Sequence, residues 1–111
     1  MKRGEIYYAN LKPTVGSEIN KKRPILIISN NANNNVADII TVIPITSNVK
    51  RIYPFDVLLE TVDTGLSKKS KAQCNQIRAI SKLRIAKKLI GMVSEKIMEE
   101  VEHAIKLHLG F

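Results

Sequence analysis

Three cations stand directly before an apolar run near the start of the chain. Lys21, Lys22 and Arg23 precede a proline, and the residues ILIIS follow at positions 25–29. A guanidinium presents several donors in a fixed plane and can bond two phosphate oxygens at once. A side chain at the first residues of a buried strand is also held more firmly than one on a loop. Arg23 is therefore a candidate phosphate-binding residue, although it could instead cap the strand and pair with an acid such as Glu18.

The other chemistry-bearing residues form no familiar metal or nucleophile pattern. The chain has one cysteine, Cys74, and two histidines, His103 and His108. The histidines are five residues apart on an expected helix, which places them off a common face. The sequence contains no paired metal-ligand spacing, glycine-rich phosphate loop or GxSxG elbow. Most familiar enzyme classes are thereby excluded, and we expect neither a metal nor a cofactor.

The charge is positive and unevenly distributed. The 111 residues carry 18 Lys and Arg against 10 Asp and Glu, a net charge of +8. Residues 1–93 hold sixteen of these bases and six of the acids, which leaves +10 on that part. A basic body of this kind attracts polyanions such as nucleic acid. Scattered lysines that merely keep a small protein soluble are an equally good explanation of charge alone.

Length and composition predict one domain spanning residues 1–111. A chain of this size can bury a core without disulfide or metal support. No apolar stretch reaches the roughly 18 residues that a membrane-spanning helix needs. The start, MKRGEIYYANL, lacks the apolar region of a signal peptide, and a single cysteine allows no internal disulfide. We therefore expect a cytoplasmic protein.

Short β-prone segments fill most of the chain, and an amphipathic helix closes it. Strands are expected at residues 5–10, 23–29, 39–46, 55–60 and 88–93, with 70–76 ambiguous and a polar turn at 30–35. After Ser94, a plausible N-cap, the apolar residues recur at helical spacing: Ile97, Val101, Ala104, Ile105 and His108 or Leu109. The pattern predicts an α+β, mainly β fold, with a small bent sheet or barrel and a C-terminal α-helix.

Five segments in order along the chain carry a family resemblance: RGEIYYANLKPTVGSE, KKRPILIISN, TVIPITS, YPFDVLL and NQIRAISKLRI. They extend from Arg3 to about Ile85, and the ordered set of GSE, RP and PxTS is more specific than any one segment. In these segments the chain resembles the MazF/PemK family of toxin endoribonucleases. The resemblance implies a small SH3-like, gyrase-poison/PemK-type β-barrel with a C-terminal α-helix, assembled as a homodimer.

The resemblance also implies an activity. Proteins of this family are toxins of type II toxin–antitoxin systems that cut single-stranded RNA at a short sequence without a metal ion. The ribose 2′-hydroxyl attacks the adjacent phosphorus, giving a 2′,3′-cyclic phosphate and a 5′-hydroxyl end. The expected partners are single-stranded RNA, a cognate antitoxin with an acidic C-terminal segment and a second copy of the chain, with no membrane.

Site residues follow from the same resemblance. The catalytic candidates are Arg23, Thr46 and Glu18: Arg23 stabilises the developing charge, Thr46 donates to a phosphate oxygen, and Glu18 either orients Arg23 or takes the 2′-hydroxyl proton. The RNA-binding candidates are Ser17, Lys21, Ser47, Asn75, Gln76 and Arg78. The chain departs from many relatives by holding Asn75 and Ser81 where they have acids, which puts a mechanism using a carboxylate from this segment in doubt.

Two alternatives and one surface complete the predictions. A gyrase-poison toxin acting by protein binding, or a non-catalytic SH3-like RNA- or protein-binding module, would share the fold. The chain has no Trp and ends HLGF, which counts against the gyrase poison.

The lysines at 68, 69 and 71, with the basic run at 82–88, are expected to attract phosphate or to dock the acidic antitoxin segment.

Overall fold

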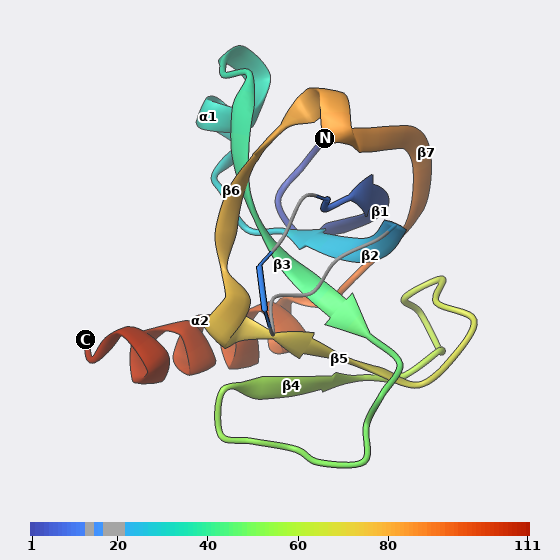
Figure 1. Cartoon of the computed structure of the whole chain (residues 1–111), viewed down its shortest axis with the longest axis vertical. Coiled ribbons are helices and arrows are strands. Elements are labelled where there is room, and N and C mark those ends of the chain that lie inside the picture. The colour runs from blue at the N-terminus through green and yellow to red at the C-terminus, as the bar shows by residue number, and fades with distance from the viewer. Residues whose placement is uncertain (13–14, 17–21) are drawn as a thin grey trace.

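The computed structural model of the chain describes residues 1–12, 15–16 and 22–111. Its elements are β1 (Glu5–Asn10), β2 (Lys22–Ile27), α1 (Asn31–Val36), β3 (Ile39–Thr46), β4 (Asp56–Leu59), β5 (Ser70–Gln73), the 3₁₀ turn η1 (Cys74–Gln76), β6 (Arg78–Ser81), the 3₁₀ turn η2 (Lys82–Arg84), β7 (Ile85–Met92) and α2 (Glu95–Leu109). Figure 1 shows the strands as one bent sheet with α2 beside it. The predicted mainly β fold with a C-terminal helix is confirmed.

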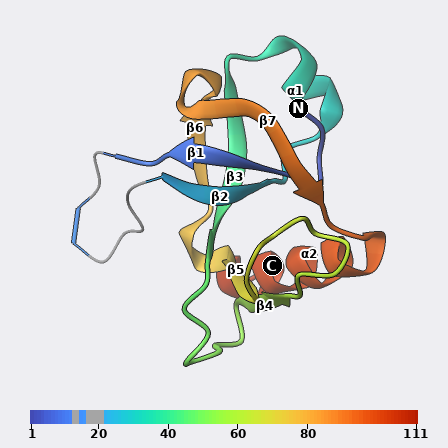
Figure 2. The ribbon, with the colours of Figure 1, turned by 90° about the vertical axis from the view of Figure 1, so that its right-hand side faces the viewer.

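The described strands form a single antiparallel sheet in the order β4-β5-β3-β2-β1-β7, with β6 also paired to β3. In Figure 2, β3 runs from the part of the sheet that holds β1, β2 and β7 to the part that holds β4 and β5. The two ends of the order, β4 and β7, are not paired with each other. The sheet is therefore a bent, open form of the predicted barrel.

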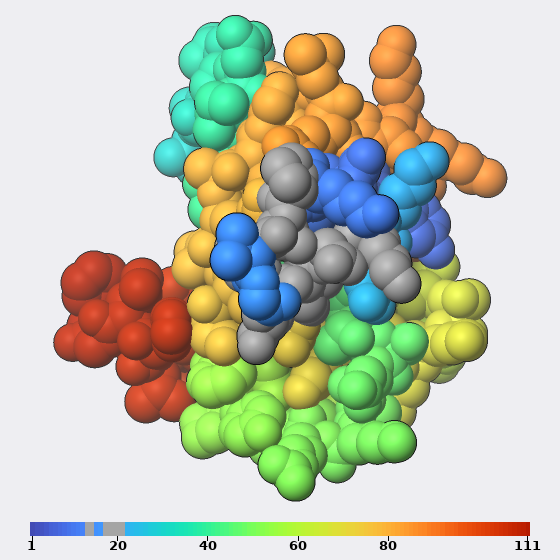
Figure 3. Space-filling model, in the orientation of Figure 1, coloured from blue at the N-terminus to red at the C-terminus, as the bar shows by residue number. Residues whose placement is uncertain are grey.

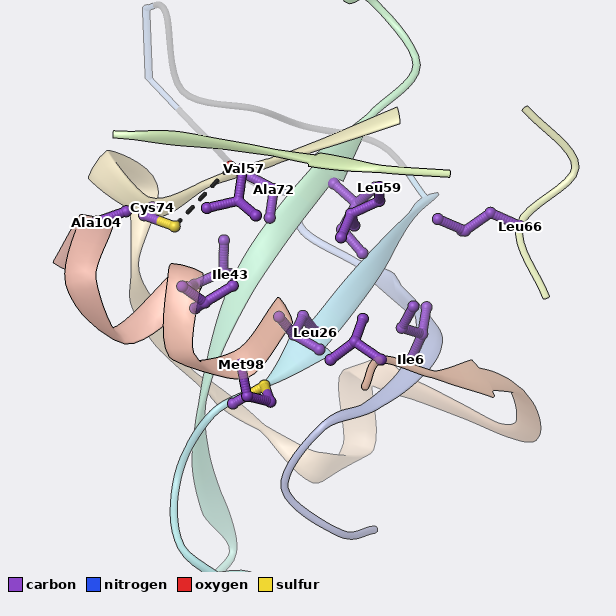
Figure 4. Close-up of a cluster of buried hydrophobic side chains, with 13 residues drawn as sticks. Ile6, Leu26, Ile43, Val57, Leu59, Leu66, Ala72, Cys74, Met98 and Ala104 are labelled. Atoms are coloured by element: carbon purple, nitrogen blue, oxygen red, sulfur yellow. Dashed lines mark hydrogen bonds between the residues drawn. The ribbon is translucent and has the colours of Figure 1, made fainter. Parts of the chain in front are cut away.

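Two apolar cores lie on opposite faces of the central strands. Neighbouring residues of a strand point to opposite faces. Ile25, Ile27 and Val42 belong to one core, which also draws on β1 and β6. Leu26 and Ile43 are partners in the β2–β3 ladder and belong to the other core, which packs under α2 (Figure 4). The central strands are thus buried on both faces, which explains the nearly continuous apolar runs in their sequences.

The caps of α2 are as predicted. Ser94 Oγ accepts the Ile97 N–H at 3.2 Å, and Glu95 lies in the first turn, where a negative charge opposes the helix dipole favourably. At the other end Gly110 adopts the left-handed conformation with φ 80°. These local signals fix where the helix begins and ends.

The buried face of α2 differs in part from the prediction. Met98, Val101 and Ala104 are the buried residues, whereas His108 and Leu109 are exposed. Figure 1 shows that the C-terminal end of α2 projects away from the sheet. The last turn therefore has no sheet to pack against, and its apolar side chains stay in solvent.

The segment predicted as a polar turn at 30–35 is instead the N-cap and most of the short helix α1. Asn30 is the N-cap of α1, and its Oδ1 accepts the Asn33 N–H at 2.8 Å. Asn34 is buried and donates from Nδ2 to the Ser29 carbonyl at 2.8 Å. Asparagine side chains can hydrogen-bond the backbone groups of either a helix N-terminus or a reverse turn. Here the burial of Asn34 favours the helix.

Two glycines let the segment between β4 and β5 approach β7 at backbone distance. A Cβ at Gly91 would lie 2.0 Å from the Thr64 carbonyl oxygen, and a Cβ at Gly65 would lie 2.1 Å from the Ile90 carbonyl oxygen. Both obstacles are backbone atoms, which cannot rotate away. Gly91 is therefore a close-approach residue, where a side chain cannot be accommodated.

We expect Gly91→Ala to lower the free energy of unfolding by about 1–3 kcal/mol, because the new methyl group forces the two backbones apart. Urea denaturation followed by circular dichroism measures this change. Met92→Ala is the control: this neighbouring side chain is exposed, so its loss should cost no more than about 0.5 kcal/mol. Equal urea midpoints for Gly91→Ala and the unmodified chain would contradict the close packing.

Cys74 is an inert, buried thiol. It is fully buried in the core beneath α2, and its Sγ contacts the Ala72 carbonyl at 3.9 Å, the dashed line in Figure 4. Burial, together with the nearby Asp56 carboxylate, raises the pKa of Cys74 from 9.0 to about 12. The folded chain therefore keeps this thiol protonated at a pH where the unfolded chain releases the proton.

This difference in pKa predicts an alkaline loss of stability. The stabilising contribution is fully present below pH 9.0 and is lost as the pH rises toward about 12. Between about pH 8 and about pH 10.5 we expect the free energy of unfolding to fall by about 1–2 kcal/mol more in the unmodified chain than in Cys74→Ala. Urea titrations at both pH values measure the difference; parallel pH dependence of the two proteins would refute it.

Candidate active site

The β2–β3 ladder ends just before Arg23 and Thr46. Its last pair joins Ile25 to Pro44. Arg23 comes two residues before Ile25, and Thr46 comes two residues after Pro44, so in antiparallel strands both lie beyond the same end of the ladder. Beyond this point β3 is paired, among the described strands, only with β5, which lies on the side of β3 opposite β2. The two predicted catalytic residues of the described chain therefore occupy matching positions where β2 and β3 separate.

Strand alternation also assigns Arg23 and Thr46 to one face of the sheet. Arg23 alternates with Ile25, and Thr46 alternates with Val42, and both of these apolar residues belong to the same core. Arg78 of β6 is the direct partner of Val42, so it shares this face as well. Two cations and one hydroxyl thus lie on the same face as that core, on three neighbouring strands.

Arg23 lines a positively charged pocket of about 520 Å³. Lys22, Lys68 and Lys88 also line it, as does Ser47, and no Asp or Glu does so among the described residues. Four cations without an acid produce a positive potential that concentrates anions. The pocket therefore provides the phosphate-attracting surface that the charge distribution predicts.

Thr46 lines a second pocket, of about 440 Å³, together with Asn48, Arg51 and Gln76. Thr46 is 8% exposed, and its Oγ1 accepts the Asn48 N–H at 3.2 Å, which leaves its own hydroxyl hydrogen to donate. Thr46 and Ser47 are consecutive in the chain, but each lines a different pocket. Arg23 and Ser47 line the first pocket, and Thr46 and Gln76 line the second.

Two arginines hold the end of β1. Arg78 Nη1 donates to the Leu11 carbonyl at 3.4 Å, and Arg84 Nη1 donates to the Asn10 carbonyl at 3.2 Å and to the Lys12 carbonyl. These carbonyls lie where the chain leaves β1 toward β2. Arg78, predicted to bind RNA, therefore has at least one structural bond, to the base of this connection.

The remaining predicted residues are only partly placed. Gln76 lines the Thr46 pocket, but Asn75 lines neither pocket, and its Oδ1 is buried without a hydrogen-bond partner. Ser17, Glu18 and Lys21 lie outside the described residues. The structure therefore brings Gln76 to the site and leaves Asn75 apart from it.

A buried ion pair next to Thr46 was not predicted. Lys71 Nζ lies 2.9 Å from Asp56 Oδ2, and their side chains are 7% and 0% exposed. The expectation that Lys71, with Lys68 and Lys69, attracts phosphate or docks an acidic antitoxin segment does not fit its position, because its cation is buried and neutralised by Asp56. Nothing in the local sequence indicates this ion pair, since the two residues are fifteen positions apart in the chain.

Metal ligands do not gather in residues 1–12, 15–16 and 22–111: no three side chains of His, Cys, Asp or Glu are placed to hold an ion there. Within the same residues, the helices are too short or too polar to pass through a bilayer.

The bent sheet, the C-terminal helix and the cationic strand end define a mainly β protein with a site suited to a phosphate-bearing ligand. The profile of the PemK-like, MazF-like toxins of type II toxin–antitoxin systems matches residues 2–109. Endoribonuclease MazF9 of Mycobacterium tuberculosis is 44% identical over 98% of this chain and 96% of its own length. Endoribonuclease EndoA of Bacillus subtilis is 32% identical over 99% and 95%. The chain belongs to the family of PemK-like, MazF-like toxins.

Solved structures agree with this fold. MazF from Deinococcus radiodurans superposes with a TM-score of 0.87 at 24% identity, covering 100% of this chain and 97% of its own. A mycobacterial endoribonuclease, solved in complex with its cognate antitoxin, has a TM-score of 0.81 at 23% identity and covers 100% and 96%. The predicted family is confirmed, and neither the gyrase-poison nor the non-catalytic alternative is favoured by these relatives.

Proposed function

We propose that the chain is the toxin of a type II toxin–antitoxin system, a single toxin domain spanning residues 1–111 that cuts single-stranded RNA, including mRNA, and so inhibits translation and growth. Curated relatives named as endoribonucleases cover nearly the whole chain. The observation that carries the proposal is the matching placement of Arg23 and Thr46 at the open end of the β2–β3 ladder. A binding module needs no guanidinium and hydroxyl at matching positions beyond one end of a ladder.

The proposed reaction uses a nucleophile that the RNA supplies. The ribose 2′-oxygen forms a bond to the adjacent phosphorus while the bond from phosphorus to the 5′-oxygen of the next nucleotide breaks. The products are a 2′,3′-cyclic phosphate and a 5′-hydroxyl, and the proton lost by the 2′-hydroxyl is balanced by the proton gained by the leaving oxygen. The protein therefore has to align the three reacting atoms and stabilise the charge on the non-bridging oxygens.

Arg23 and Thr46 have different roles in stabilising the charge on the non-bridging oxygens. The Arg23 guanidinium bonds the non-bridging oxygens, and because a guanidinium keeps its proton at neutral pH, it acts by charge and not as the base. The Thr46 hydroxyl donates to one of the same oxygens. Glu18 is the proposed acceptor of the 2′-hydroxyl proton or the partner that orients Arg23.

The surroundings of the two pockets bind the rest of the RNA. Lys22 and Lys88 attract the phosphates on the Arg23 side, where the half-exposed ring of Tyr8 is available for base stacking. Gln76 can read a base edge on the Thr46 side. The other proposed RNA contacts are Ser17, Lys21, Ser47 and Arg78; Asn75, which lines neither pocket, is not retained among them.

The partners follow the family. A mycobacterial endoribonuclease and the Deinococcus radiodurans MazF have been solved as complexes with antitoxins. We infer that a cognate antitoxin with an acidic C-terminal segment occupies the cationic face of this chain, that the chain forms a homodimer, and that it acts in the cytoplasm, where mRNA is found.

We expect Arg23→Ala to reduce RNA cleavage by at least about 10²–10³-fold with little change in stability, because it removes the donors to the reacting phosphate. Arg23→Lys keeps the charge but not the planar fork, so it should recover only a small part of the rate. Digestion of a long mixed-sequence RNA, with mapping of the cut sites, measures both. The control is Lys106→Ala on the exposed side of α2. Undiminished cutting by folded Arg23→Ala would remove Arg23 from the site.

Cleavage should persist in excess EDTA, because the substrate supplies its own nucleophile and the guanidinium supplies the positive charge. The new ends should carry a cyclic phosphate and a 5′-hydroxyl. The latter accepts phosphate from polynucleotide kinase without prior phosphatase treatment, which provides the measurement. Complete loss in EDTA with recovery on adding Mg²⁺ would show that the proposed mechanism is wrong.

A further inference from the structure

Lys71 is the direct cross-strand partner of Thr46. The two residues face each other in the β3–β5 ladder and are 5% and 8% exposed. Side chains of such a pair are neighbours on one face of a sheet. A lysine in this position loses its hydration, so its charge is tolerated only with a close counter-ion and further hydrogen bonds.

The Lys71 ammonium contacts two groups in the segment that leads from β3 into β4 and one at the first residue of β4. It lies 2.9 Å from Asp56 Oδ2, donates to the Arg51 carbonyl at 2.6 Å, and lies 5.5 Å from the centre of the Tyr53 ring. Asp56 Oδ2 also accepts the Tyr53 N–H at 2.8 Å, and the Tyr53 ring stacks on Phe55. One buried cation thus holds the second half of residues 47–55.

The first half of the same segment is held from Thr46. Its Oγ1 accepts the Asn48 N–H at 3.2 Å, and Asn48 Oδ1 accepts the Lys50 N–H at 3.3 Å. Residues 47–55, green in Figures 1 and 3, run along the edge of the molecule beside this region. They supply Asn48, Lys50, Arg51 and Tyr53 to the wall of the Thr46 pocket. The shape of that wall therefore depends on both attachments.

We propose that Lys71, which is 5% exposed and also lines the Thr46 pocket, is a positioning residue for RNA cleavage that acts through Asp56 and residues 47–55. This inference rests on the proposed function, since it assigns the Thr46 pocket to the RNA next to the cut. The bonds from Lys71 fix the pocket wall relative to the Thr46 hydroxyl. A displacement of about 1 Å at such a site can cost about a hundredfold in rate.

The charge balance separates this role from phosphate attraction. Asp56 neutralises Lys71 at 2.9 Å, whereas Lys68 and Lys88 lie in a pocket with no acidic lining residue among those described. Loss of a phosphate-attracting lysine weakens substrate binding and its dependence on salt. Loss of a positioning lysine lowers kcat and alters which bases are accepted beside the cut, while KM and the salt dependence change little.

The decisive variant combines Lys71→Met with Asp56→Asn. Lys71→Met alone leaves a buried carboxylate without its cation, which destabilises the fold, while the pair of changes removes both charges together. We expect the double variant to fold, to lose about tenfold to a hundredfold in kcat on an oligonucleotide carrying the mapped cut site, and to cut at a broader set of sequences. Asp56→Asn alone leaves the Lys71 ammonium without its counter-ion and should be less stable than the double variant. Tyr53→Leu removes only the exposed ring beside the ammonium and should show the same changes in kcat and cut sites at smaller size, even where the double variant does not fold.

Lys96→Met is the matched control, because it removes one lysine charge from an exposed position in the first turn of α2. It should leave kcat and the cut sites unchanged. A second readout is independent of activity: trypsin should cut after Arg51 faster in the double variant than in the unmodified chain, since residues 47–55 lose their attachment. Mass spectrometry of the early fragments identifies this cut.

The outcomes are distinct. A folded double variant with unchanged kcat and cut sites would overturn the positioning role, as would a loss confined to KM and salt dependence. An unmodified chain that leaves all RNA intact would instead refute the proposed function and the cleavage part of this inference, and the tryptic rate would then decide by itself whether Lys71 holds residues 47–55.

Discussion

The structure depends on the pairing of one strand, β3, with three others. Its first half is hydrogen-bonded to β6 on one side and, near its middle, to β2 on the other, and its last two residues pair with β5. Pro44 lies where the pairing with β2 ends, and a proline has no N–H to extend a ladder. The change of partner bends the sheet and produces its two cores, one on each face of β2 and β3.

The same change of partner creates the candidate site. A residue in the middle of a ladder has its backbone paired on both sides and its neighbours fixed, which leaves no room for a ligand. Thr46 is the last residue of β3, so it is paired with Lys71 on one side, while on the β2 side the ladder has already ended and Arg23 stands at the matching position. The strands therefore hold both residues at the open end of the ladder, where rigid elements can position them for the proposed stabilisation of a transition state.

The sequence allowed the prediction of features that depend on local pattern. Apolar runs placed β2 and β3, and the Ser94 cap placed the start of α2. The ordered motifs then identified the family and singled out Arg23 and Thr46.

Features that depend on long-range contacts could not be predicted in this way. A lysine in SKAQ carries no sign that its charge is buried, because its burial depends on Asp56 in another strand. The exposed last turn of α2 likewise depends on where the sheet ends, and not on the helix's own sequence.

The cations of the chain differ in how deeply they are buried, and we expect their roles to differ accordingly. Arg23 lines a pocket together with three lysines, and such a cluster of positive charge favours anions. Lys71 has its counter-ion, Asp56, inside the protein, so we expect its charge to stabilise the local structure and to add little to the attraction of a polyanion.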